Sequence, residues 1–256
     1  MAKRIIGVIP ARLESVRLPR KPLLPILGHP MIAWVYARAR AARLLTQLLV
    51  ATDSDEVLEW CRSLRIPAAI TSPAHHSGTE RVFEVMTRQS RDGERGDIYV
   101  NIQCDEPLVE AEHIEKLLSP LLESASTEVS TLRVPLDPRD AASPHKVKVV
   151  IDGKGRALYF SRSMIPYSVE AESPAALFKH LGLYAYSAAA LEKFRHLPPG
   201  PLERAEKLEQ LRFLENGIAV AVPATSKDTI GIDTAEDLRA VEEYFKRSGI
   251  EFPEIS

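Results

Sequence analysis

Four cations lie within one short loop that follows the first apolar strand of the sequence. The loop reads PARLESVRLPRKPL at residues 10–23 and carries Arg12, Arg17, Arg20 and Lys21. Such a cluster repels itself unless something negative binds there. Arginine offers forked donors that match a phosphate group and lysine offers a point charge, so the loop predicts a site for a phosphate-bearing ligand. The alternative is a solvated basic loop, which the position directly after the first strand disfavours.

Two acidic residues follow other apolar segments. Asp105 lies in NIQCDEP (101–107) and Asp233 lies in TIGIDTAEDL (229–238). Magnesium binds one or two carboxylates together with phosphate oxygens and water, so both residues are candidate metal ligands beside a phosphate site. Each also has a structural alternative: Asp105 as a turn or helix-capping acid before Pro107, and Asp233 as a helix N-cap.

Alternating strands and helices position these residues in the first half of the chain. Strand-length apolar runs alternate with amphipathic helical patterns, which is typical of βαβ units and a parallel sheet. Ligands bind at the carboxyl ends of the strands in such sheets, and the basic loop and Asp105 both follow strands there. The predicted strands are 4–9, 48–52, 68–71 and 97–103, and the predicted helices are 30–43, 54–64, 77–89 and 110–123.

The second half of the chain is richer in strand patterns. We predict strands at 130–135, 146–152, 157–162, 180–186 and 218–223, and helices at 202–215 and from Thr234 to about Lys246, with Asp233 and Glu236 as a cap pair. The fold class is therefore α/β, with a mostly parallel central sheet and a small mixed α+β lobe. We expect a single domain over residues 1–256, with the lobe inserted at about 155–200.

Composition excludes several classes of protein. The 256 residues carry a formal net charge of −2, which argues against a nucleic-acid partner. Apolar runs are too short for a membrane span, and MAKRIIGVIP predicts a first strand rather than a signal peptide. Two cysteines, Cys61 and Cys104, are too few for a disulfide framework, so we expect a cytoplasmic protein. The dinucleotide-binding and P-loop glycine motifs are absent, which disfavours a Rossmann oxidoreductase.

Eight motifs together carry a family resemblance. From about residue 4 to 245 the chain closely resembles the 3-deoxy-manno-octulosonate (Kdo) cytidylyltransferases, or CMP-Kdo synthetases. The opening motif is shared more loosely with other sugar nucleotidyltransferases, whereas SGTER, ALYFSR and LEQLR are more specific. In order, the motifs are PARLESVRLPRKPL, HHSGTERV, NIQCDEP, HKVKVV, ALYFSRSMIP, HLGLYAY, LEQLR and GIDTAEDL.

The resemblance implies a fold and a reaction. The fold would be the Rossmann-like three-layer nucleotidyltransferase fold. The anomeric hydroxyl of Kdo would attack the α-phosphorus of CTP, giving CMP-Kdo for lipopolysaccharide biosynthesis and pyrophosphate. Members of the family are cytoplasmic, Mg²⁺-dependent homodimers.

The resemblance also assigns roles to residues. By analogy Arg12 and Lys21 hold the triphosphate, Ser15 donates to a phosphate oxygen, and Asp105 and Asp233 bind Mg²⁺. The residues at the positions that grip the nucleotide are Ala11, Ser77, Gly78, Thr79, Arg81 and Gln103. Those at the Kdo-side positions are Arg162, His180, Tyr184, Glu209 and Gln210.

Some of these assignments have simpler alternatives. His180 and Tyr184 alternate with leucines and could form the polar face of a strand, and Glu209 and Gln210 could lie on a solvated helix face. The adjacent His75 and His76 favour loop structure over a metal site, because no cysteine or aspartate has matching spacing.

Two positions depart from the family pattern. Cys104 and Arg20 both stand where the family usually has glycine. Glycine beside Asp105 allows close approach of the backbone to the nucleotide, so Cys104 could alter ribose contact or metal affinity and add sensitivity to thiol reagents. Arg20 adds charge and removes backbone freedom. Neither change deletes a candidate ligand.

Two other functions remain as alternatives. A cytidylyltransferase for a sialic acid or an amino-substituted Kdo would use the same opening loop, and only the second-half motifs favour Kdo. A catalytically silent nucleotide-binding domain would lack a metal carboxylate or the lysine, but Lys21, Asp105 and Asp233 are all present.

Overall fold

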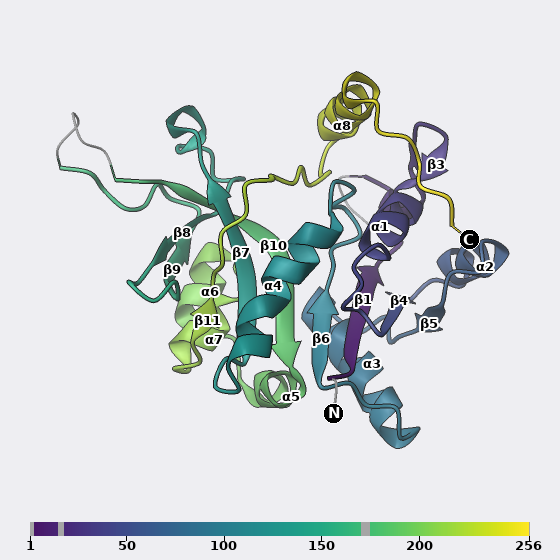
Figure 1. The fold of residues 1–256 in the computed structure, drawn as a ribbon, viewed down its shortest axis with the longest axis horizontal. Coiled ribbons are helices and arrows are strands. Elements are labelled where there is room, and N and C mark those ends of the chain that lie inside the picture. Colours follow the sequence, from purple (N-terminus) through teal and green to yellow (C-terminus); the bar gives the residue numbers. More distant parts are fainter. Residues whose placement is uncertain (1–2, 15–17, 170–174, 256) are drawn as a thin grey trace. The chain divides into compact units, whose positions relative to one another are not determined.

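The computed structural model describes residues 3–14, 18–169 and 175–255, which fold as two compact units. The first unit is Met1–Glu115 with Thr229–Ser256, and the second is Lys116–Asp228. Helix α4 (Ala111–Glu123) carries the chain from the first unit into the second. Figure 1 shows the elements of both.

A four-stranded parallel sheet forms the centre of the first unit. Its strands β6 (Ile98–Asn101), β1 (Ile5–Ala11), β4 (Gln47–Thr52) and β5 (Ala68–Ile70) lie side by side in this order. Every residue of β1 is buried, as expected for a central strand covered on both faces. The predicted strands are therefore present and parallel.

Helices on both faces make the first unit a three-layer structure. The chain crosses from β1 through α1 (Met31–Ala39) to β4, and through α2 (Asp55–Ser63) to β5. It then returns through α3 (Gly78–Arg91) to β6, on the other side of β1. Right-handed crossovers that run in opposite directions place α1 and α2 on one face and α3 on the other. The α/β fold class is confirmed.

Short elements and a last helix complete the first unit. They are the 3₁₀ helix η1 (Lys21–Leu23), the hairpin of β2 (Pro25–Ile26) and β3 (His29–Pro30), and α8 (Ala235–Ser248).

The second unit is built on mostly antiparallel strands. In this unit β7 (Val129–Pro135) pairs with β10 (Phe178–Ser187), β10 with β8 (Lys148–Ile151), and β8 with β9 (Ala157–Ser161), all antiparallel. The short strand β11 (Val220–Ala221) runs parallel to β7. Residues 155–169 and 175–200 lie in this unit, and the inserted lobe stays a prediction.

Helices in the second unit differ from the predicted pattern. The stretch 202–215 forms two helices, α6 (Pro201–Glu206) and α7 (Leu211–Glu215), because Lys207 takes a left-handed backbone conformation with φ of 55° that ends α6. Helix α5 (Ala188–His196) was not predicted; the Ser187 hydroxyl caps it by accepting from the Ala190 N–H. A 3₁₀ turn, η2 (Pro138–Asp140), follows β7. Within the described ranges, no helix is both long and apolar enough to cross a bilayer.

Candidate active site

Lys21, Asp105 and Asp233 converge in the first unit. The Lys21 Nζ donates to Asp105 Oδ2 at 2.5 Å and to Asp233 Oδ1 at 3.0 Å, although 84 and 212 positions separate the acids from it in the sequence. Burial lowers the pKa of Lys21, but the two carboxylates outweigh this effect and raise the pKa above its ordinary value. The site therefore holds one ammonium between two carboxylates at neutral pH.

Lys21 is more buried than a loop at an open sheet edge would suggest. Its exposed fraction is 8%, whereas the side chains of Asp105 and Asp233 are 29% and 47% exposed. The side chains of both acids keep surface toward solvent, whereas that of the lysine is mostly covered. This arrangement leaves the carboxylates accessible to a further cation.

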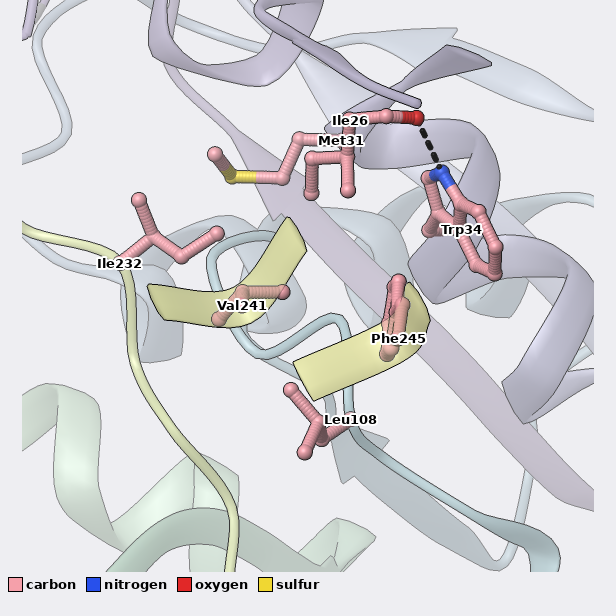
Figure 2. Close-up of a cluster of buried hydrophobic side chains, with 7 residues drawn as sticks. All are labelled: Ile26, Met31, Trp34, Leu108, Ile232, Val241 and Phe245. Carbon is pink, nitrogen blue, oxygen red and sulfur yellow. Dashed lines mark hydrogen bonds between the residues drawn. The ribbon is translucent and has the colours of Figure 1, made fainter. Parts of the chain in front are cut away.

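A hydrophobic cluster holds the three segments together. Ile26 follows the Lys21 turn, Leu108 follows Asp105, and Ile232 directly precedes Asp233, and all three side chains are buried in one cluster with Met31, Trp34, Val241 and Phe245. Figure 2 shows these side chains facing one another, with the Trp34 indole N–H donating to the Ile26 carbonyl at 2.8 Å. The Ile232 N–H also donates to the Asp105 carbonyl at 2.9 Å. Apolar packing therefore fixes the charged cluster.

Asp233 does not cap helix α8. The cap is Thr234, whose hydroxyl accepts from the Asp237 N–H, while the Asp237 carboxylate accepts from the Thr234 N–H in a capping box. The predicted cap pair of Asp233 and Glu236 is therefore wrong by one residue. The shift leaves the Asp233 carboxylate directed to Lys21.

Arg20 has a strained backbone conformation. Its φ of 58° and ψ of 29° lie in the left-handed region, which glycine adopts without cost. This geometry explains why glycine suits the position. The Arg20 side chain forms an ion pair with Glu56, and it does not join the carboxylate cluster.

A cavity lies at the carboxyl ends of β1, β4 and β5. It has a volume of about 360 Å³, and its wall consists of Arg12, Leu13, Glu14, Asp53, Ser54, Pro73, His75 and His76. The exposed Arg12 donates to the His75 carbonyl at 2.7 Å. The His75 ring in turn hydrogen-bonds Glu84 at 2.6 Å. The two histidines are therefore loop residues of a cavity wall, and no metal-binding group of three His, Cys, Asp or Glu exists in the part of the chain that the structure describes.

The SGTER motif begins helix α3. The Ser77 hydroxyl caps the helix by accepting from the Glu80 N–H at 3.2 Å. A side chain at Gly78 would approach the Asn101 amide and Pro10 to 3.2–3.3 Å, so glycine allows the close packing of this turn against β1 and β6. Thr79 is buried beside it.

Arg81 is an internal residue of the first unit. Its guanidinium is 2% exposed, donates to Thr71 Oγ1 at 2.7 Å and the Ser72 carbonyl at 3.2 Å, and forms an ion pair with Asp53. It supports the cavity wall through Asp53 rather than lining the cavity. Asp53 was missed, although it follows strand β4 as Asp105 follows β6, and the same pattern identifies both.

The remaining first-unit candidates lie along the sheet edge. Ala11 is the buried last residue of β1. Gln103 follows β6 and donates to Asn101 Oδ1 at 3.2 Å. Ser15 lies outside the described residues.

Cys104 lies beside the charged cluster. Burial, together with the charge of Asp105, raises the pKa of its thiol to about 12, which keeps it protonated at neutral pH. The expected sensitivity to thiol reagents requires a thiolate, and this environment disfavours one.

The sugar-side candidates lie in the second unit. The Arg162 guanidinium donates to main-chain carbonyls of Glu206 at 2.8 Å and Pro144 at 3.0 Å. His180 and Tyr184 follow each other on β10, with ring centroids 5.5 Å apart. Glu209 is half-buried just before α7.

His180 is a neutral, buried histidine. Burial lowers its pKa to about 3, with a smaller contribution from the charge of Lys179. Its Nε2 lies 2.9 Å from the Thr131 hydroxyl, which in turn lies 2.8 Å from the Leu183 carbonyl. Because that hydroxyl has one proton to give to a carbonyl, it accepts from an Nε2–H of His180. His180 can therefore serve a ligand only as a neutral hydrogen-bonding group.

Gln210 is also a buried polar group, and Tyr184 is half-buried. Burial raises the pKa of Tyr184 well above its ordinary value, so its phenol is neutral. Gln210 is 5% exposed, and its amide nitrogen has no hydrogen-bond partner among the residues that the structure describes. A buried amide donor without a partner is costly. Gln210 thus does not lie on a solvated helix face, and the cost is removed if a ligand accepts from it.

The chain is similar to known proteins over most of its length. The family model described as Cytidylyltransferase matches residues 6–227. The chain is 53% identical to a 3-deoxy-manno-octulosonate cytidylyltransferase of Acidobacterium capsulatum, over 93% of this chain and 95% of the relative. It is 47% identical to the protein of that name from Koribacter versatilis, over 95% and 90%. A solved CMP:2-keto-3-deoxy-manno-octonic acid synthetase complexed with CTP superposes with a TM-score of 0.90 at 39% identity, covering 96% of this chain and 99% of that chain.

Proposed function

Because the chain belongs to the cytidylyltransferase family, and within it to the 3-deoxy-manno-octulosonate cytidylyltransferases, we propose that it activates Kdo with CTP. The anomeric hydroxyl oxygen of Kdo bonds to the α-phosphorus of CTP, and the bond from that phosphorus to the bridging oxygen breaks. Pyrophosphate and the hydroxyl proton leave, and CMP-Kdo is available for lipopolysaccharide biosynthesis. The observation that carries the proposal is the convergence of Lys21, Asp105 and Asp233.

The cations of the first unit bind the triphosphate in this proposal. Phosphoryl transfer depends on positioning and on offsetting charge more than on covalent help from the protein. Arg12 lines the cavity and is already oriented by the His75 carbonyl. Lys21 is held by two carboxylates and exchanges part of this contact for phosphate oxygens. Ser15 donates to a phosphate oxygen.

Asp105 and Asp233 fit a magnesium site. Their oxygens already approach a single cation, the Lys21 ammonium, to 3.0 Å or less, and both keep exposed surface. Two carboxylates that leave room for phosphate oxygens and water are a donor set that Mg²⁺ uses. When bound, the ion supplies charge that stabilises the phosphates and makes the sugar hydroxyl more acidic.

The start of α3 and the sheet edge bind the nucleoside. Gly78 allows the backbone to come close to its neighbours, and the backbone groups of such a turn can accept from the cytosine amino group and donate to its carbonyl. Ala11, Ser77, Thr79 and Gln103 contribute to this contact. Arg81 acts through Asp53 in the cavity wall.

The second unit supplies the residues for the sugar acid. Arg162 is the cation for the Kdo carboxylate, and His180, Tyr184, Glu209 and Gln210 serve its hydroxyls. The buried Gln210 amide without a partner supports this role, because a hydroxyl can accept from it. We further propose a cytoplasmic homodimer, as expected from the family resemblance.

A pyrophosphate-release assay tests the proposal. The purified protein is incubated with Mg²⁺, one nucleotide and one sugar acid. We expect release with CTP and Kdo, and none with sialic acid or with ATP, GTP or UTP. Release with CTP and sialic acid only would overturn the sugar assignment, and no release from folded protein would indicate a silent nucleotide-binding domain.

A further inference from the structure

Lys148 is a buried cation in the second unit that no part of the proposed reaction uses. It begins strand β8, where it pairs with Ser161 of β9 on one side and Lys179 of β10 on the other. Its exposed fraction is 0%, and burial lowers its pKa. A lysine in this position is costly unless its ammonium is bound.

Main-chain carbonyls hold the Lys148 ammonium. Its Nζ donates to the Ser143 carbonyl at 2.8 Å and to the Arg162 carbonyl at 2.5 Å. The described residues place no carboxylate within salt-bridge distance of it. A packed apolar side chain at this position would avoid the cost of burying a charge. Because a buried charge is costly, the hydrogen bond from the Lys148 ammonium to the Arg162 carbonyl needs an explanation.

Arg162 is fixed at both its backbone and its side chain. Its N–H donates to the Glu206 carboxylate at 2.9 Å, and Ser161 Oγ donates to the same carboxylate at 2.6 Å. Three of its guanidinium N–H groups point to the carbonyls of Pro144, Glu206 and Lys207. A guanidinium has five N–H donors, so one N–H on each terminal nitrogen has no acceptor within the described part of the chain. Two such donors match the two oxygens of a carboxylate.

Lys148 connects the two segments that surround the Arg162 side chain. The turn with Ser143 and Pro144 and the end of β9 with Arg162 meet at its ammonium, and the Arg162 side chain spans the same two segments. Without the ammonium, the carbonyls of Ser143 and Arg162 lose their shared donor. Of the two backbone contacts described above for Arg162, only the one with Glu206 would then remain.

We propose that Lys148 is a positioning residue that fixes the Arg162 guanidinium for the carboxylate of the sugar acid. The inference rests on the proposed function, because it needs Arg162 to bind that substrate. Lys148 itself touches no substrate. Its loss should therefore weaken binding of the sugar acid and leave the nucleotide reaction centre in the first unit unaffected.

The test compares Lys148→Met with Lys154→Met in steady-state kinetics. Lys154 is an exposed lysine in the turn after β8, so the control removes the same charge from the same hairpin. We expect Lys148→Met to raise the KM for Kdo about tenfold, since small misplacements of a binding group have effects of this size or larger. The KM for CTP and kcat at saturating Kdo should stay within about twofold.

A merely structural role would produce a different pattern. Equal KM values for Kdo in folded Lys148→Met and wild type would overturn the proposal, as would parallel rises in both KM values. Lys148→Gln keeps one N–H donor for a carbonyl and should show a smaller rise in the KM for Kdo. If Lys148→Met does not fold, Lys148→Gln decides: an unchanged KM for Kdo refutes the role. Wild type that is inactive with CTP and Kdo would refute the proposed function instead.

Discussion

Replacing Lys21 with methionine should weaken the reaction and strengthen metal binding. In the structure the Lys21 ammonium occupies the space between Asp105 and Asp233, at 2.5 and 3.0 Å. It thereby neutralises part of the charge that a divalent ion would use. Methionine has a similar length and no charge, so it leaves two carboxylates without their internal cation.

The gain in metal affinity can be calculated from the repulsion between the Lys21 ammonium and the metal ion, which the substitution removes. Two unit charges about 4 Å apart interact by about 1 kcal/mol in bulk water, and a doubly charged ion doubles this to about 2 kcal/mol. The bulk-water value is a lower bound here, because the Lys21 side chain is 10% exposed although that of Asp233 is 47% exposed. Since about 1.4 kcal/mol is tenfold in affinity, Lys21→Met should bind a divalent ion at least about thirtyfold more tightly. Turnover should fall about a hundredfold or more, as for loss of one transition-state contact.

Binding of Mn²⁺, as a substitute for Mg²⁺, can be followed by electron paramagnetic resonance in the absence of nucleotide. Arg20→Met is the matched control, because it removes the neighbouring cation, whose partner is Glu56 and not the carboxylate cluster. Asp105→Asn should change the affinity in the opposite direction. If Lys21→Met and wild type bind Mn²⁺ equally, the carboxylates that hold Lys21 are not the metal ligands and the reasoning fails.

Further outcomes are expected at four positions. Asp105→Asn should lower kcat about a hundredfold with an unchanged circular dichroism spectrum, and near-normal turnover would remove its assigned role. Cys104→Gly should be at least as active as wild type, and mass spectrometry should find Cys104 unmodified by iodoacetamide at neutral pH, because burial raises the pKa of its thiol to about 12. Relative to His180→Gln, wild type should lose up to about 1.4 kcal/mol of stability per pH unit as the pH falls from 6.5 toward about 3, since the unfolded state takes up a proton that buried His180 refuses; equal slopes for the two proteins in urea titrations would contradict this. Arg20→Gly should raise the free energy of unfolding by up to about 1 kcal/mol by removing left-handed strain, and a clear decrease in urea denaturation would contradict this.

Local patterns in the sequence predict the parallel half of the fold well. Short apolar runs between turn signals favour buried strands, and the helices between them have apolar stripes and caps such as Ser77. The carboxyl ends of parallel strands meet at one edge, so Arg12 and Asp105 could be assigned to that edge from order alone. The same reasoning applied to Asp53 would have found the carboxylate that holds Arg81.

Tertiary contacts decide the features that the sequence pattern missed. Helical periodicity runs through residues 202–215, and only the left-handed Lys207 separates α6 from α7. Before α8, Asp233 and Thr234 are both residue types that cap helices well. Thr234 is the cap because Ile232 packs in the hydrophobic cluster and Lys21 attracts the Asp233 carboxylate. These choices depend on residues distant in the sequence, which a local pattern does not contain.

The environment of Lys21 depends both on the local sequence and on contacts with residues distant in the sequence. The sequence places it in a basic loop, where the simplest expectation is a mobile, solvated cation. In the structure Lys21 is 8% exposed, because its turn packs against the hydrophobic cluster around Trp34. Two carboxylates offset the cost of burying its charge. A cation held in this way is already oriented before substrate binds, and it loses less freedom when a phosphate replaces a carboxylate. The apolar cluster in Figure 2 therefore supports the proposed catalytic arrangement, although none of its side chains can do chemistry.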